Sequence, residues 1–314
     1  PSLSILDGEG AACRQAGGGE ALRGEVLKKI YNSDGTIVQV KNINGYLIDA
    51  PNIFVESRQH PLCDVPEIGI GNKPIDGGNY LFTEEEMQAF IKKEPKAEPY
   101  FKKWVGAHEF INGYFRYCLW LGKCTQKELL SMPECLKRVD NVRNFRLSSS
   151  RKSTLKLAEK PTHFQVETIP DSNYLILPLT SSEKRRYVPI GFATPDIMPS
   201  NLVNVVFNAE IYHFGVLTSN VFMAWMRAVC GRLKSDYRIT KDNLYNTFPF
   251  PNPTPEQKKL IEKTAQHILD VRAKYPDCSF ADMYGDKMYL FSDLVTAHQA
   301  NDKAVMLAYG FDYK

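Results

Sequence analysis

Short apolar runs separated by turn-forming residues dominate the first part of the chain and predict strands. The run TIVQV follows the turn Asn32-Ser-Asp-Gly35, and two further runs of the same kind come after it. The aromatic run YFRYCLWL lies between Gly113 and Gly122, which leaves too few residues for a stable helix. Strands are therefore predicted at residues 36–40, 46–48, 53–55 and 114–121.

Glycine and proline predict a loop over residues 66–79, where four glycines and two prolines occur together. Helices are expected where a capping sequence precedes helical spacing. Thr83-Glu-Glu-Glu86 is a capping box and predicts a helix that runs to about Lys93. A long polar helix or helix pair is predicted over residues 125–158, with Pro133 interrupting it near its start.

Strand and helix signals then alternate irregularly. Strands are predicted at residues 163–169, 174–179, 187–192 and 202–207. Thr218 or Ser219 caps a helix that ends before Gly231. The helical spacing of its large apolar residues favours core packing over a base-stacking strip for Phe222, Trp225 and Met226. Because no regular strand–helix rhythm is present, the predicted fold class is α+β.

The passage Phe248-Pro-Phe-Pro-Asn-Pro253 predicts a rigid extended connection, since proline fixes φ and disfavours helix in the preceding residue. Directly after it, the capping box Thr254-Pro-Glu-Gln257 opens a helix, and a last helix is predicted from a Ser292 cap to Gly310. One face of the first of these helices carries Leu260, Ile261, Ala265, Ile268, Leu269 and Arg272. The sequence therefore predicts a mixed-sheet domain over residues 41–247 and a small all-helical domain over residues 248–314.

Composition narrows the class of protein. With 314 residues and 43% apolar side chains, the chain can bury the cores of two or three domains. No run approaches the roughly 18 to 20 apolar residues of a membrane span, and no signal-peptide pattern opens the chain, so a cytoplasmic protein without a membrane partner is expected. Seven cysteines without a Cys-x-x-Cys pair argue against a disulfide framework. The glycine-rich residues 1–25 are interpreted as a linker or lead-in.

Motifs that would carry a reaction are absent from the sequence. It has no phosphate-binding loop, dinucleotide fingerprint, nucleophile elbow or zinc-protease motif. The six histidines are scattered, and His60 with Cys63 is the one close His/Cys pair, so no metal site is predicted. Glu256-Gln-Lys258 has the Glu-x-Lys shape of many nucleases, but a glutamate is expected at a helix start. No catalytic residue is predicted in this chain.

Positive charge is concentrated in three segments although the net charge is only +3. Residues 137–160 carry eight Lys or Arg against two acidic residues, and residues 225–241 carry five against one. The third segment is Lys184-Arg-Arg186. Lysine, arginine and serine bind phosphate, and arginine also reads guanine bidentately, so this clustering favours a nucleic-acid partner over a merely solvated basic face. Tyr237 and Tyr245 are expected at the surface.

Six segments in order resemble a known family. They are KNINGYLIDAPNIFVESR (41–58), CDVPEIGIGNKPIDGGN (63–79), RYCLWL (116–121), SNYLILPLTSSEKRRYVPIGF (172–192), HFGVLTSNVFMAWMRAVCGRLKSDYR (213–238) and LYNTFPFPNPTPEQ (244–257). They are similar to the C-terminal half of MmeI-like class I DNA methyltransferases, which are single-chain type IIG restriction-modification enzymes and related adenine-N6 methyltransferases. The resemblance extends from about residue 26 to residue 314.

This resemblance implies a DNA target-recognition domain followed by a helical C-terminal domain, with residues 26–40 as the last strand of a preceding methyltransferase domain. The chain lacks the glycine-rich cofactor motif and the Asn-Pro-Pro-Tyr/Phe motif that holds a flipped adenine. S-adenosylmethionine is therefore expected to bind elsewhere in the parent enzyme, and no methyl transfer is expected from this chain alone. The implied partners are double-stranded DNA and a methyltransferase, either in the same polypeptide or as a separate subunit.

The implied function is sequence-specific recognition of duplex DNA, which positions the target base for flipping and methylation. Candidate base readers are Asn72, Lys73, Arg116, Lys123, Arg185 and Arg186. Candidate phosphate-binding residues are Arg143, Arg146, Arg151, Lys152, Ser181, Ser182, Lys184, Lys234 and Arg238. The alternative function is a protein-interaction scaffold that does not bind DNA and whose basic helices pack on acidic partner surfaces.

Overall fold

The computed structural model describes residues 28–31, 34–44, 49–52 and 54–312, and the chain divides into the compact units 1–54 and 55–314. In the first unit, strands β1 (Lys28–Tyr31) and β2 (Ile37–Val40) form an antiparallel ribbon, which confirms the strand predicted at residues 36–40. The strand predicted at 46–48 lies outside the described residues. Of the strand predicted at 53–55, residue 53 also lies outside them, and residues 54 and 55 are not in a strand.

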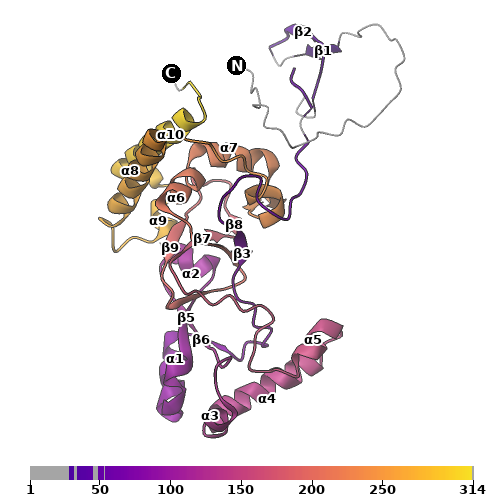
Figure 1. Ribbon diagram of the computed structural model, residues 1–314, viewed down its shortest axis with the longest axis vertical. Coiled ribbons are helices and arrows are strands. Elements are labelled where there is room, and N and C mark those ends of the chain that lie inside the picture. The colour runs from indigo at the N-terminus through magenta and orange to yellow at the C-terminus, as the bar shows by residue number, and fades with distance from the viewer. Residues whose placement is uncertain (1–27, 32–33, 45–48, 53, 313–314) are drawn as a thin grey trace. The chain divides into compact units, whose positions relative to one another are not determined.

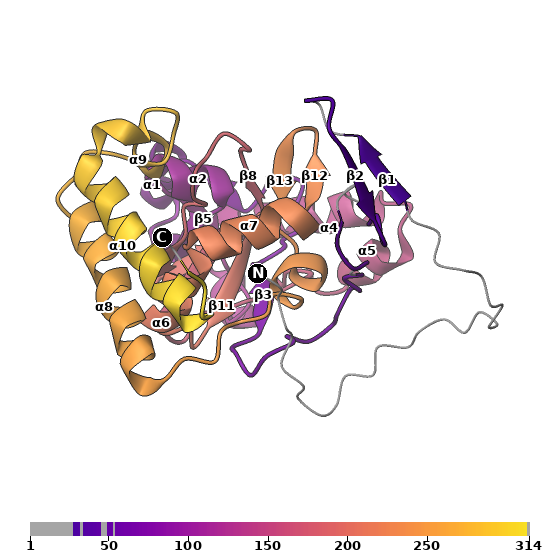
Figure 2. The same cartoon turned by 90° about the horizontal axis from the view of Figure 1, so that it is seen from above.

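Three sheets and a series of helices make up the second unit, in agreement with the predicted α+β class (Figures 1 and 2). The strand order is β10-β5-β6-β4 in the first sheet, β3-β11-β7-β9 in the second and β12-β13-β8 in the third. The bounds are β3 Ile68–Ile70, β4 Leu81–Phe82, β5 Phe101–Val105, β6 Arg116–Leu119, β7 Tyr174–Pro178, β8 Thr180–Ser181, β9 Gly191–Ala193, β10 Ile197–Pro199, β11 Val203–Phe207, β12 Gly231–Leu233 and β13 Asp236–Arg238.

The second sheet is buried on both faces. Along β7, Leu175 and Leu177 point into the largest hydrophobic cluster, whereas Tyr174 and Ile176 point into a smaller one on the other side. Side chains alternate between the two faces of a strand, so a strand buried on both sides has a continuous apolar sequence. This explains why the run at 174–179 is read correctly as a strand from the sequence.

Three of the other predicted elements need correction. The loop predicted at residues 66–79 contains β3, which pairs with β11 in the second sheet. Its neighbour Gly71 lies so close to the backbone of Pro199 and Ser200 that an added Cβ would come within 2.2 Å of the Ser200 carbonyl oxygen. Gly71 therefore permits a close approach of the chain after β3 to the end of β10, whereas Gly77 and Gly78 lie in a turn.

Residues 163–169 do not form the predicted strand. They contain a single isolated bridge between Val166 and Lys73. The run predicted at 187–192 contributes only its end to β9, although residues 187–190 are buried. Phe164 and residues 187–190 are buried, but they do not pair as strands. Burial explains their apolar character, whereas pairing also needs a partner strand in register.

The helices follow the predicted capping signals closely. Thr83 caps α1 (Glu84–Lys93), and the polar stretch at 125–158 forms α3 (Gln126–Leu130), α4 (Pro133–Leu147) and α5 (Lys152–Leu157). The shorter elements are α2 (Ala107–Asn112), the 3₁₀ helices η1 (Pro95–Tyr100) and η3 (Met288–Leu290), and the π-helical turn η2 (Lys241–Tyr245). Every helix in the described part of the chain is too short or too polar to cross a membrane.

The remaining α-helices are α6 (Ile211–Leu217), which the sequence did not predict, α7 (Asn220–Val229), α8 (Pro255–Arg272), α9 (Phe280–Met283) and α10 (Ser292–Ala308). The strands β12 and β13 separate α7 from α8. Ser219 caps α7 and Thr254 caps α8 as predicted, but Ser292 is the first residue of α10 and Phe291 is its cap. Helices α8 and α10 lie side by side (Figures 1 and 2). On the predicted face of α8, Leu260 is the exposed exception.

Candidate nucleic-acid interface

The third sheet brings two of the basic segments together. Strands β12 and β13 form a hairpin, and β13 also pairs with β8. Strand β8 leads directly into the basic triplet at residues 184–186, whereas the hairpin carries three of the five basic residues of segment 225–241, namely Arg232, Lys234 and Arg238. Two basic segments that are separate in the sequence thus share one small sheet and its loops, which we call the third-sheet surface.

The pairing register decides where the side chains of this sheet point. Tyr237 lies opposite both Arg232 and Ser181, so these three share one face. The Arg232 guanidinium lies 3.9 Å from the centre of the Tyr237 ring. Arg238 lies opposite Thr180 on the other face and is exposed. Arg232 is also exposed, and the list of candidate residues from the sequence omitted it although it belongs to the same basic segment.

The hairpin turn presents Lys234 to solvent. Its φ of +56° lies in the left-handed region, which an L side chain rarely adopts. Strain of this kind persists only where the surrounding structure holds the backbone, and a cation at the tip of a short hairpin is well placed to reach a ligand. Lys234 is therefore an exposed cation at the tip of the hairpin, held in an unusual backbone conformation.

The loop after β8 holds its predicted residues in different environments. Lys184 and Arg186 are exposed, and the half-buried Ser182 accepts the Lys184 backbone N–H at 3.3 Å. Arg185 is half-buried, and this burial lowers the pKa of its guanidinium although Asp236 and Asp286 favour the charged form. Ser181 is only 1% exposed, so its hydroxyl is out of reach of a phosphate at the surface.

Asn72 is a structural residue, which corrects its prediction as a base reader. It has no exposed surface. Its side-chain amide donates to the carbonyls of Thr168 and Pro199 at 2.8 and 2.9 Å, and its Oδ1 accepts the Thr168 N–H at 2.7 Å. These bonds join the residues after β3 to β10 and to the segment before β7, so the polar atoms of this side chain serve the fold.

Arg146 is likewise buried, which corrects its prediction as a phosphate contact. Its guanidinium makes five hydrogen bonds of 2.8–3.0 Å to the backbone carbonyls of Pro74, Ile75, Leu157, Lys160 and His163. Arginine has five N–H donors, so its donor capacity is used within the protein. Burial lowers the pKa of this group, and Tyr80 and Asp76 oppose that shift.

The remaining candidates lie in two further places. Arg143, Arg151 and Lys152 are exposed on α4 and around the start of α5. Lys73, Arg116 and Lys123 lie on or near the first sheet: Lys73 and Arg116 are half-buried, and Lys123 is exposed with its ammonium 5.8 Å from the Trp120 ring centre. The structure thus groups Ser182, Lys184, Arg185, Arg186, Lys234 and Arg238 on the third-sheet surface and leaves the others on separate elements.

Two tyrosines were predicted wrongly. Tyr237 is 5% exposed and Tyr245 is fully buried, where its hydroxyl donates to the Pro66 carbonyl at 2.7 Å. Both belong to the largest core, in which Phe222 and Met226 are also buried and Trp225 is half-buried against them. The predicted core role of the α7 residues is confirmed.

Metal-binding groups do not converge in the described part of the chain, where no three His, Cys, Asp or Glu side chains come together. His60 pairs with Glu67 at 2.8 Å. That hydrogen bond lowers the pKa of the Glu67 carboxyl. The side chains that gather on this protein are cations and hydroxyl groups suited to binding an anion.

Comparisons with known proteins agree with this chemistry. The family described as "MmeI, target recognition domain" matches residues 49–252, and the one described as "MmeI, C-terminal domain" matches residues 253–313. DNA methyltransferase A of Bacillus subtilis strain 168 is 42% identical over 284 residues, which are 90% of this chain and 32% of that protein. A solved structure of the type IIL restriction-modification enzyme MmeI in complex with DNA has a TM-score of 0.84 at 42% identity, over 93% of this chain and 40% of that one. The chain therefore spans well under half the length of both relatives.

Proposed function

The chain belongs to the MmeI family, whose target recognition and C-terminal domains it contains, and we propose that it recognises a specific sequence in double-stranded DNA. Its relatives include an enzyme named as a DNA methyltransferase and one solved in complex with DNA. A methyltransferase that flips its target base out of the duplex needs further protein surface to hold the surrounding DNA. The recognition chain supplies that surface.

The grouping of cations on the third-sheet surface carries this proposal. Lys184, Arg186, Lys234 and Arg238 are exposed there, on a sheet that joins two separate segments. Exposed like charges repel one another, and an anion bound among them lowers this repulsion. The regular phosphates of duplex DNA provide such an anion along an extended surface.

Within this function, phosphate contacts are assigned to Arg143, Arg151, Lys152, Ser182, Lys184, Lys234 and Arg238. Base reading is assigned to Lys73, Arg116, Lys123, Arg185 and Arg186. Arg116 and Arg185 are half-buried, so their orientation is restricted by neighbouring groups. A guanidinium held in one orientation discriminates better between bases than a freely rotating one, because its bidentate geometry is already formed.

We assign methylation itself to a methyltransferase domain outside the 314 residues, in a parent restriction-modification enzyme of type IIG. That part would bind S-adenosylmethionine, take up the flipped adenine and transfer the methyl group to its N6, either in the same polypeptide or in a separate subunit. The chain lacks the glycine-rich cofactor motif and the Asn-Pro-Pro-Tyr/Phe motif. We assign residues 26–40 to the end of the methyltransferase, 41–247 to DNA recognition and 248–314 to the helical C-terminal domain.

A salt titration of duplex binding tests the proposal. Fluorescence anisotropy of a labelled duplex with the 314-residue chain should give a plot of log K against log salt with a negative slope of several units. Selection from a random duplex library should enrich one sequence. The double variant Lys184→Ala/Lys234→Ala should lower both the affinity and the slope, whereas Lys263→Ala, an exposed lysine on α8, should change neither.

The alternative function, a protein-interaction scaffold, predicts the opposite result in this titration. It expects no preference for a duplex and no enriched sequence, and its basic helices would instead bind acidic protein surfaces. Binding that is weak, independent of salt and equal for all sequences would therefore remove the DNA-recognition proposal.

A further inference from the structure

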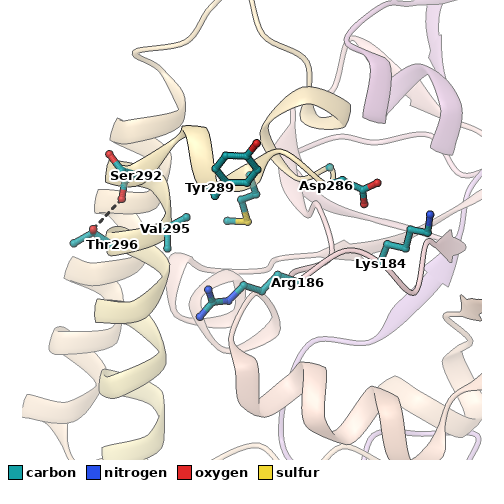
Figure 3. A pocket seen from close by; sticks show the side chains of 9 residues that line it. Lys184, Arg186, Asp286, Tyr289, Ser292, Val295 and Thr296 are labelled. Atoms are coloured by element: carbon teal, nitrogen blue, oxygen red, sulfur yellow. Dashed lines mark hydrogen bonds between the residues drawn. The ribbon is translucent and has the colours of Figure 1, made fainter.

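An open pocket of about 530 Å³ lies between the loop after β8 and the segment that leads into α10 (Figure 3). Lys184 and Arg186 line it from the loop. Tyr289, Ser292 and Thr296 line it from the helical region, which none of the DNA contacts assigned above includes. The pocket thus combines residues from the regions matched by the recognition and the C-terminal families.

The polar lining of the pocket consists mainly of hydrogen-bond donors. Figure 3 shows the Arg186 guanidinium extending toward α10 and the Tyr289 ring standing above it. Ser292 and Tyr289 are exposed and offer hydroxyl groups, whereas the Thr296 hydroxyl already donates to the Ser292 carbonyl at 2.8 Å. Ammonium, guanidinium and hydroxyl groups together suit an oxyanion.

The charge of the pocket indicates which oxyanion fits. Two cations, Lys184 and Arg186, face one carboxylate, Asp286, so the lining carries a net charge of +1. A phosphodiester carries one negative charge, whereas a phosphomonoester carries about 1.5 to 2 at neutral pH. The lining therefore matches a phosphodiester better than a free phosphate or a nucleotide.

The two walls of the pocket are tied together. Tyr187, which directly follows Arg186, donates its hydroxyl proton to Asp302 at 2.7 Å and stacks on His298 with ring centres 4.1 Å apart. Arg272 donates to the Ile190 carbonyl at 2.6 Å. Because Asp302, His298 and Arg272 belong to α10 and α8, the basic loop is fixed to the helical region before a ligand arrives. A preformed site loses little conformational entropy on binding.

We propose that this pocket binds a phosphodiester group of the DNA duplex, so that the C-terminal domain takes part directly in DNA binding. The inference rests on the proposed function and deepens it. Tyr289 and Ser292 donate hydrogen bonds to the phosphate oxygens, and Lys184 and Arg186 neutralise the charge. Under this inference Arg186 binds phosphate, in place of the base-reading role assigned to it above. Asp286 weakens this site and limits it to a singly charged group.

Asp286→Asn is the most informative variant, because it should increase affinity. It removes the one negative charge of the lining and should tighten duplex binding about threefold at low salt. Asp277→Asn makes the same change in net charge at an exposed aspartate that does not line the pocket, and should leave the affinity unchanged. A gain of affinity cannot result from partial unfolding.

Ser292→Glu tests the opposite direction. Ser292 is the first residue of α10, where a glutamate favours the helix dipole, so the melting temperature should stay the same or rise. The added charge should nevertheless weaken duplex binding about tenfold. Gln299→Glu, at an exposed position farther along α10, is the matched control and should bind like the unchanged chain.

The outcomes separate this inference from the function on which it rests. If the unchanged chain binds duplex DNA with a steep salt dependence but Asp286→Asn and Ser292→Glu behave like their controls, the pocket does not hold a phosphodiester and the recognition function stands. If the unchanged chain does not bind duplex DNA, both are overturned. If both variants shift in the stated directions, the C-terminal domain contacts DNA through this pocket.

Discussion

Arg146 uses its positive charge to hold the backbone. Its five N–H groups donate to three carbonyls within the segment that joins α4 to β7 and to two carbonyls in the loop before β4. A buried carbonyl that loses its partner costs about 1 to 3 kcal/mol, and several would lose theirs together. At the scale of single residues, an arginine can therefore bind an external anion or stabilise the fold. Whether its guanidinium is buried distinguishes the two roles.

Arg146→Met should lower the free energy of unfolding by about 3 to 5 kcal/mol, because the carbonyls remain buried without donors. Urea denaturation followed by circular dichroism measures this. Arg143→Met, one turn earlier on α4 and exposed, should change stability by less than about 0.5 kcal/mol and weaken duplex binding instead. Equal denaturation midpoints for the two variants would contradict the structural role of Arg146.

At the scale of elements, the β12–β13 hairpin brings three exposed basic residues together in a short piece of chain. Its pairing with β8 places Arg238 and the loop at 182–186 on one small sheet. The hairpin is only three residues long on each side, so its geometry depends strongly on its turn. Lys234 in this turn has a positive φ, which is unfavourable for a lysine, and it is also one of the proposed phosphate contacts.

Lys234→Gly should separate these two effects. Glycine adopts a positive φ without steric cost, so the variant should be more stable by up to about 1 kcal/mol. Loss of the cation should lower duplex affinity and reduce the salt slope by about one unit. Thermal melting and anisotropy measure the two quantities on the same sample. A variant that gains stability and keeps full affinity would exclude Lys234 as a DNA contact.

Recognition and helical regions share one hydrophobic core at the scale of the whole molecule. That core contains Leu175 of β7, Phe222 of α7, Ile261 of α8 and Val305 of α10. Apolar surface on the sheet is covered by the helices, and the helices bury their apolar faces on the sheet in return. The compact unit 55–314 accordingly has no division at the proline passage.

Removal of residues 253–314 should therefore abolish folding, because the sheet loses the helices that cover it. The shortened chain should show no cooperative thermal transition by circular dichroism or calorimetry. A chain without residues 1–54 retains the whole core and should melt cooperatively, which makes it the matched control. Cooperative melting of the 1–252 fragment would show that the two regions are energetically independent.

The amino-acid sequence by itself determined what depends on near neighbours. The helix starts after Thr83, Ser219 and Thr254 follow from capping bonds that span three residues. The buried strands β7 and β11 follow from continuous apolar runs. The basic segments and the ordered motifs of the family are equally visible in the printed sequence.

Only the tertiary structure decided what depends on distant partners. It paired β3 with β11 inside an expected loop, buried Asn72, Arg146 and Tyr245, and joined the loop at 182–186 to a distant hairpin and to α10. Charge and hydrogen-bonding capacity are properties of a residue type, but whether they meet solvent or backbone is set by segments far away in the chain. For this reason the family and the basic segments could be read from the sequence, whereas the basic residues that remain exposed could be identified only from the fold.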